Sequence, residues 1–419
     1  MTRLIFILVL LLMVFPEVSL QTSFVFNREL TYTPWQIKFF DVIGIPDLIV
    51  ISTAIFLGIR SLRRVTLHRN EFDKVLIFSL IYLLLGLTYN LFIYSSWKTY
   101  VYDIKSVMFV TVFYYLFNEF KYRKEIYWFT PKNIFWAGLF AAMLDTFYVH
   151  NFGTVEYPEF LGFPATATVL YTPILFYYAY FAEGLKDKLL YGIVFVYEIV
   201  SLVNKLTLSV IYYTMCAPIY IVAYSISKNS RMRLMLLSTV FIFTDIVGPV
   251  VIIYTPFGIL NAKEDGLVTR KIQWDNFLEN AKINYPILIG KGAGATWFEI
   301  TPIPEADIYS YGTSVGGTAE DSRDSPVKFI FNVAPAGILH KWGIFGALTA
   351  ILLIISFVLA GVKKNYKWNL NSKMIFFSAL YLGLQNILFL GILKASLLAA
   401  IFLFWSFNTN LINKKNTHI

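Results

Sequence analysis

The chain is poor in the residues that build disulfide frameworks, metal centres and charged surfaces. Its one cysteine, Cys216, lies in an apolar run, which excludes an internal disulfide and a site with several cysteine ligands. Its four histidines are widely spaced and form no local metal-binding pattern. Only 15% of the 419 residues are charged. The sequence therefore shows no local metal-binding pattern of cysteines or histidines, and no cofactor is expected.

Apolar residues, by contrast, make up 57% of the chain and are gathered in long runs. Soluble domains usually contain about 45–50% apolar residues, so this chain has more apolar surface than a soluble globule can bury. The runs predict an all-α polytopic membrane protein with about 11–12 transmembrane helices, since roughly 20 apolar residues cross a bilayer. The candidate spans after the first are 42–59, 75–96, 104–119, 133–149, 166–182, 189–204, 206–226, 234–257, 342–362, 374–391 and 395–409.

The first apolar run, Leu4–Phe15, allows two interpretations. It is short for a span and suits the apolar part of a signal peptide, yet no small-residue cleavage motif follows it. An uncleaved first span is therefore favoured over a signal peptide.

Lysines and arginines are concentrated in alternate loops, which predicts the orientation of the chain. Such loops stay in the cytoplasm, and here they lie near 60–74, 121–132, 186–188, 228–233 and 363–373. Both termini are then cytoplasmic, and the long polar segment lies on the far side of the membrane. The same placement accounts for the net charge of +9 without a nucleic-acid partner.

These patterns divide the chain into three regions. Residues 1–257 form an N-terminal membrane bundle, 258–341 a large outer loop with amphipathic helices, and 342–419 the C-terminal transmembrane helices. The outer loop is the long polar stretch of the sequence, so we expect any chemistry to take place there.

The first part of the outer loop predicts an amphipathic helix. Thr269 can cap its start, and apolar residues then recur at three- and four-residue spacing at Trp274, Phe277, Leu278, Ala281 and Tyr285. Arg270 and Trp274 are one turn apart at the predicted N-terminus, where free backbone N–H groups favour an anion. The guanidinium could bind phosphate oxygens at two points, or it could reach lipid headgroups beside an interfacial tryptophan.

A glycine-rich turn follows Pro286, which ends the helix. Gly290, Gly292 and Gly294 let the backbone approach a ligand closely, and their spacing is similar to that of nucleotide-binding loops. No strand is predicted before them and no Gly-Lys-Ser/Thr is present, so a tight structural turn is the alternative to a substrate-binding role.

The remainder of the outer loop is irregular and acidic up to about residue 326. Arg323 stands among these acids, either as an ion-pair partner or as a further catalytic cation. Residues Lys328–Trp342 predict a re-entrant or interfacial helix that carries Asn332 and His340. An imidazole titrates near neutral pH, so His340 is either the loop's best general base or a polar tip at the membrane boundary.

Four acids fall within the apolar runs, namely Asp47, Asp145, Glu198 and Asp245. An unpaired charge at the bilayer centre costs at least roughly 2.5–3.5 kcal/mol, so each must be satisfied. They either line a cavity under the loop, with Glu198 as a substrate contact or reserve base, or they pair with helix ends or stay protonated.

The order of the loop motifs resembles the O-antigen ligase and O-antigen polymerase superfamily of bacterial envelope proteins. The motifs are Arg270-x3-Trp274, the glycine-rich turn, and a polar residue eleven positions before Gly343-Ile-Phe-Gly346. The resemblance implies a metal-independent glycosyl transfer at the periplasmic face of the inner membrane. The donor would be a glycan on undecaprenyl diphosphate, and the acceptor a sugar hydroxyl on a glycan or a lipid A core. Arg270 matches the family's loop arginine, which holds the diphosphate, and Trp274 matches the aromatic residue of that motif.

The chain departs from this family at the expected base. Ligases of the superfamily commonly carry a His-Asn pair at the start of the third motif, but that slot holds Asn332 here, and Lys341 replaces a usual acid. His340, about two turns further on, is a candidate replacement. The departure favours a repeat-unit polymerase over a ligase and leaves an inactive scaffold open. The alternative from another class is a transporter or flippase of lipid-linked sugars, although the internal repeats usual in transporters are not evident.

Overall fold

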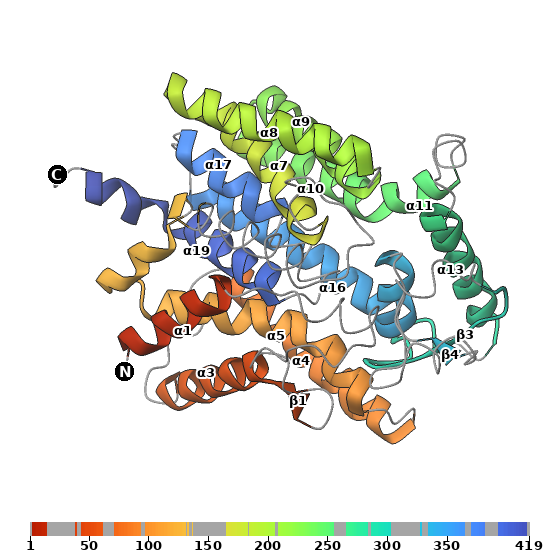
Figure 1. Cartoon of the computed structure of the whole chain (residues 1–419). Coiled ribbons are helices and arrows are strands. Elements are labelled where there is room, and N and C mark those ends of the chain that lie inside the picture. The colour runs from red at the N-terminus through yellow and green to blue at the C-terminus, as the bar shows by residue number, and fades with distance from the viewer. Residues whose placement is uncertain are drawn as a thin grey trace, which may run out of the picture.

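The computed structural model of the chain describes residues 2–14, 38–39, 43–61, 71–93, 97–130, 132–133, 136, 165–182, 184–205, 208–254, 265–283, 286–302, 327–328, 334–364, 370–381 and 393–416. These residues are mostly helical (Figure 1). The α-helices are α1 Thr2–Val14, α3 Ile45–Ser61, α4 Glu71–Ile93, α5 Trp97–Glu119, α7 Ala165–Phe181, α8 Leu185–Lys205, α9 Leu208–Ile226, α10 Ser230–Phe241, α11 Gly248–Ile253, α13 Asp265–Ala281, α16 Ala334–Lys364, α17 Leu370–Ala379 and α19 Leu393–Asn416.

Two short antiparallel strand pairs and two other helical turns complete the described chain. Strand β1 (Lys38–Phe39) pairs with β2 (Ile43–Gly44), and β3 (Trp297–Phe298) pairs with β4 (Val327–Lys328). A 3-10 helix η2 covers Lys124–Phe129, and a π-helical turn η3, Ile242–Val247, joins α10 to α11.

The all-α prediction is confirmed, and the described parts of the predicted spans are mainly helical. An exception is the beginning of the span 42–59, where Ile43–Gly44 forms strand β2 and the helix begins at Ile45. The span 133–149 lies almost wholly outside the described residues. Within the described ranges, the helical stretch long and apolar enough to cross a membrane is Pro335–Val362, in α16. Shorter apolar stretches are Asp47–Leu57, Thr214–Ile226 and Ser396–Asn408. The larger number of spans stays a prediction from the sequence.

The helices form a bundle in which α16, α17 and α19 lie between two outer groups (Figure 1). On one side α19 packs on α5 and α16 packs on α4, while on the other side α17 packs on α7 and α16 on α10. Helix α13 and the pair β3–β4 lie at one end of the bundle, beside α11 and the beginning of α16 (Figure 1). The described residues of the outer loop in α13 and β3 therefore pack at the end of the bundle where α16 begins.

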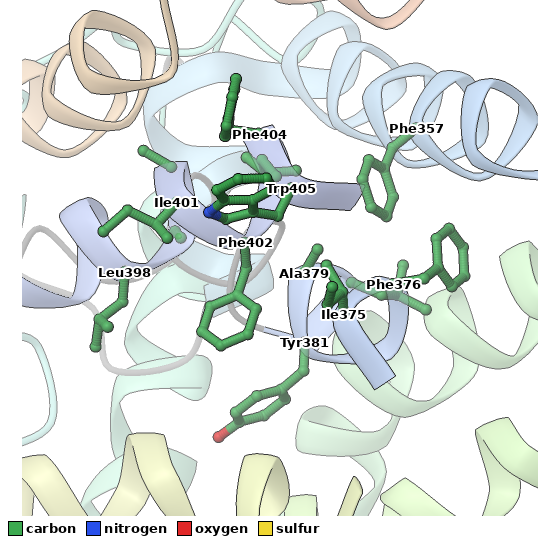
Figure 2. Close-up of a cluster of buried hydrophobic side chains, with 14 of the residues drawn as sticks. Phe357, Ile375, Phe376, Ala379, Tyr381, Leu398, Ile401, Phe402, Phe404 and Trp405 are labelled. Atoms are coloured by element: carbon green, nitrogen blue, oxygen red, sulfur yellow. The ribbon is translucent and has the colours of Figure 1, made fainter. Parts of the chain in front are cut away.

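Aromatic side chains fill the centre of the bundle (Figure 2). Phe357 of α16 stacks on Phe376 of α17 with ring centroids 5.3 Å apart and an interplanar angle of 5°. Gly361 allows this approach, because a Cβ there would lie 2.5 Å from the Phe376 ring. Trp405 of α19 is fully buried, and its indole N–H donates to the Phe129 carbonyl at 2.6 Å. The stack of Phe357 on Phe376 fixes the end of α16 that lies away from α13.

The acids within the apolar runs have different positions. Asp47 is buried in the first turn of α3, where a carboxylate is favourable to the helix dipole. Asp145 lies outside the described residues, and Glu198 and Asp245 are described only by their backbones, in α8 and η3. Asp73, which was not singled out from the sequence, is buried in α4 and accepts a hydrogen bond from the Tyr114 hydroxyl at 2.9 Å.

Candidate functional site

Helix α13 begins at Asp265, earlier than the predicted start at Thr269. Thr269 is therefore inside the helix and does not cap it. The free N–H groups of a helix belong to its first four residues, and Arg270 lies beyond them in the second turn. The predicted pairing of Arg270 with a helix N-terminal anion site is wrong for this reason. The side chain must act by its own charge.

The Arg270 side chain is partly buried and incompletely satisfied. Its Nε is inaccessible and has no hydrogen-bond partner among the described protein groups. Leaving a buried donor without an acceptor costs about 1–3 kcal/mol, and more for a charged group. An anion reaches this nitrogen only if neighbouring groups move, and its oxygens would then relieve this cost.

Trp274 follows Arg270 by one turn and packs into a small core between α13 and α16. Its ring centroid lies 5.4 Å from that of Phe277, and Phe277 packs with the buried Trp297 and Ala336. Leu278, which the sequence placed on the same apolar stripe, is instead 44% exposed. Leu278 is therefore not part of the buried face of α13, which carries two asparagines beside these apolar residues.

Two asparagines on that face bind the strand that follows the glycine-rich turn. Asn280 pairs with both backbone groups of Phe298, accepting from its N–H at 2.9 Å and donating to its carbonyl at 2.7 Å. Asn276 accepts from the N–H groups of Ile300 and Thr301 and donates to the Thr301 carbonyl. These side-chain amides thus make hydrogen bonds to the backbone like those that a neighbouring strand would make.

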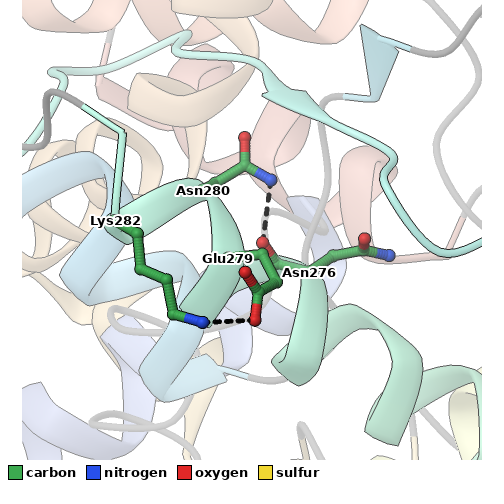
Figure 3. A network of polar contacts seen from close by, with 4 residues as sticks. All are labelled: Asn276, Glu279, Asn280 and Lys282. Atoms are coloured by element: carbon green, nitrogen blue, oxygen red, sulfur yellow. Dashed lines mark hydrogen bonds and ion pairs between the residues drawn. The ribbon is translucent and has the colours of Figure 1, made fainter.

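The same two asparagines are linked to each other along the helix (Figure 3). The Asn280 amide also donates to the Asn276 carbonyl at 2.8 Å, and both side chains are buried. On the exposed side of the helix Lys282 pairs with Glu279 at 2.6 Å (Figure 3). Helix α13 therefore binds the backbone of residues 298–301 through its inner face.

The glycine turn, defined as residues 286–294, binds a break in α16. The break is at Gly343, where φ is 64° and ψ is −164°. A helix end leaves carbonyls without partners, and here those of His340 and Lys341 accept hydrogen bonds from the turn. The donors are the N–H groups of Lys291 at 2.8 Å and Gly292 at 2.7 Å.

The turn also satisfies the second side of the break. The N–H groups of Ile344 and Phe345 begin the next helical segment and would otherwise lack partners. They donate to the carbonyls of Ile287 at 2.9 Å and Leu288 at 3.0 Å. The glycine turn thus caps both helix ends, and its N–H groups at Lys291 and Gly292 are occupied by protein.

The break has a further partner on α4. The hydroxyl of Tyr82 donates to the Trp342 carbonyl at 2.8 Å. Gly346 lies close by, and a Cβ there would come within 3.7 Å of the Tyr82 ring and would overlap the side chain of Trp342. The Gly-Ile-Phe-Gly sequence at 343–346 is therefore explained by packing at the break.

His340 lies on the short helical segment before the break and is 1% exposed. Its Nε2 is 3.0 Å from the Thr296 carbonyl, which can only accept, so the ring donates there and its proton is on Nε2. The ring also meets Phe277 edge-on, with centroids 6.5 Å apart. His340 therefore connects α16, the segment after the glycine turn, and α13.

Two lysines bring positive charge close to this histidine, namely Lys291 and Lys341. Lys291 is partly buried at the glycine turn, and this burial lowers the pKa of its ammonium group below the usual value of 10.5. Lys341 is buried in α16. The region around the glycine turn is accordingly cationic. Arg270 lies on α13, which packs on α16.

The structure brings together some of the predicted site residues. Gly290, Gly292 and His340 meet at the break, and Trp274 reaches His340 through Phe277. Gly294 has a positive φ of 76° in the same turn. Arg323 and Asn332 lie outside the described residues. Glu198 belongs to α8, which lies in one of the outer helix groups (Figure 1).

Sequence reasoning missed Asn276, Asn280 and Tyr82. The Asn-x3-Asn spacing on a predicted amphipathic helix was the available signal for the first two, since it places both amides on one face. Nothing in the sequence indicates that Tyr82 reaches Trp342 across 260 residues. In comparisons with known proteins, no family model, no curated protein and no solved structure matches the chain.

Proposed function

We propose that the chain is a polytopic membrane glycosyltransferase that uses a lipid diphosphate-linked glycan as donor. It transfers the glycan to a sugar hydroxyl at the outer face of the membrane, as a repeat-unit polymerase or as a ligase. The order of the loop motifs is similar to that of the O-antigen polymerase and ligase superfamily. The observation that carries the proposal is the buried Nε of Arg270, which has no hydrogen-bond partner among the described residues.

The chemistry of the leaving group explains why such a cation is useful. When the bond from the sugar to the diphosphate breaks, negative charge grows on the diphosphate oxygens. A fixed guanidinium near them therefore stabilises the transition state more than the bound substrate. Arg270 is held by α13, which Trp274 and Phe277 anchor to the bundle, so its charge is positioned before the substrate binds.

No base is required at the leaving group, but the acceptor hydroxyl must lose a proton. His340 is the predicted base, and with its proton on Nε2 the atom able to accept another is Nδ1. The ring is 1% exposed, so an acceptor hydroxyl reaches Nδ1 only if neighbouring groups move. The proposal therefore depends on Arg270 and does not depend on His340 as the base.

The test is to assay membranes that contain Arg270→Ala, Arg270→Lys or Lys271→Ala. The substrate is an undecaprenyl diphosphate-linked repeat unit, and the readout is glycan chain length. Lys271 is the exposed neighbour on the same helix and serves as the matched control for loss of positive charge. We expect Arg270→Ala to lower the rate by about 100-fold or more, Arg270→Lys to recover part of it, and Lys271→Ala to retain it. Full activity of Arg270→Ala with intact membrane insertion would refute the proposal.

A further inference from the structure

The tip of the glycine turn carries three consecutive large apolar side chains that point away from the protein. Ile287, Leu288 and Ile289 are 57%, 53% and 43% exposed. Their backbones, in contrast, are engaged, because the carbonyls of Ile287 and Leu288 cap the second segment of α16. Leucine and isoleucine at a tight turn have no local conformational advantage, so their exposure calls for a partner.

This apolar tip continues onto α16. Ile344 and Phe345, which bind the tip by backbone hydrogen bonds, are 38% and 46% exposed, and Leu348 follows one turn later at 49%. We name these three residues with Ile287, Leu288 and Ile289 the apolar ridge. The ridge therefore joins the turn to the outer face of the stretch with the length and composition of a membrane span.

The length of α16 after the break indicates the depth at which the apolar ridge would lie relative to a bilayer. From Ile344 to Lys364 the helix is about 31 Å long at about 1.5 Å per residue. The hydrocarbon core of a bilayer is about 30 Å thick, so this segment is long enough to cross it once, and Ile344 would then lie at one boundary. Irregular backbone at that level must be satisfied by protein, and the mutual capping of the turn and the break provides this.

We propose that the apolar ridge inserts into the outer leaflet, with the Ile287–Ile289 tip among the upper acyl chains. The inference rests on the membrane location proposed above. Lys282 and Lys291, on either side of the tip, would then meet the anionic phosphates of the headgroups. The glycine turn would act as a wedge that holds the outer-loop end of α16 at a fixed depth.

The single natural cysteine makes a direct test simple. In a Cys216→Ser background, one cysteine is introduced at Leu288, Lys282 or Leu352, and each is given a nitroxide label. Leu288 and Leu352 are 53% and 51% exposed, and the side chain of Lys282 is 67% exposed, so each position tolerates the label. The proteins are reconstituted in phosphatidylethanolamine–phosphatidylglycerol vesicles. Collision rates of each label with dissolved oxygen and with a water-soluble nickel chelate are then measured.

We expect the labels at 288 and 352 to favour oxygen over nickel several-fold more than the label at 282. If 288 resembles 282 while 352 favours oxygen, the wedge is refuted and the membrane location stands. If 352 also resembles 282, the membrane location itself fails. Spin–spin broadening at 288 that disappears on dilution with unlabelled protein would identify a second copy as the occupant and would also refute the wedge.

Discussion

Gly290 and Gly343 lie back to back, and each occupies the space that a side chain on the other residue would need. A Cβ on Gly290 would lie 2.5 Å from the backbone nitrogen of Gly343, and a Cβ on Gly343 would lie 2.5 Å from that of Gly290. Both residues also have positive φ, at 71° and 64°. The two backbones are therefore in direct contact, and a side chain at either position would prevent the glycine turn and the broken helix from capping each other.

We therefore predict that Gly290→Ala and Gly343→Ala each destabilise the protein by at least about 3 kcal/mol, from steric overlap and left-handed backbone strain. The matched control is Gly192→Ala in α8, where a Cβ would meet nothing within 4 Å. That change should be neutral or stabilising by up to about 1 kcal/mol. Thermal unfolding in detergent measures all three variants. Equal melting temperatures for Gly290→Ala and the control would contradict the close packing of Gly290 on Gly343.

Helices with strong apolar patterns could be predicted from the sequence, because helix formation and burial both follow local periodicity. Contacts between distant residues could not. The glycines were recognised as a turn, but their partner Gly343 lies some fifty residues away, and only the fold brings the two together. The start of α13 was predicted late because Thr269 is a good capping residue, whereas the helix already includes Asp265.

The asparagines of α13 give a second prediction. Asn276→Ala removes the partners of three backbone groups in residues 300–301, and Asn280→Ala removes those of Phe298. Each change should cost about 2–3 kcal/mol, because buried donors and acceptors are left unsatisfied. Hydrogen exchange should show faster exchange at Phe298 and Ile300.

The control for this pair is Lys282→Ala, which removes an exposed ion pair on the outer side of the same helix. It should change stability by no more than about 0.5 kcal/mol. Protection at Phe298 that survives Asn280→Ala would show that the strand is held by other contacts.

His340 allows a test that separates a positioning role from proton transfer. Its buried Nε2–H donates to Thr296, and a glutamine amide can replace that donor whereas alanine cannot. We expect His340→Ala to lose about 1–3 kcal/mol of stability and His340→Gln to recover most of it, together with glycan transfer. A stable but inactive His340→Gln protein, with a changed pH profile, would instead identify His340 as the predicted base.

Lys291 provides a prediction of pH dependence. Burial lowers the pKa of its ammonium group below 10.5 in the folded protein, so the unfolded chain binds more protons between the folded pKa and 10.5. Stability contributed by this residue must then rise with pH across that window and stay flat below it. Lys291→Met keeps the apolar stem and removes the titrating group. The melting temperature of wild type minus that of Lys291→Met should therefore increase as the pH rises towards 10.5. Subtraction cancels the other lysines and tyrosines, which titrate alike in both proteins. A difference that stays constant over this range would mean that the Lys291 ammonium group is solvated and has the same pKa in the folded and the unfolded protein.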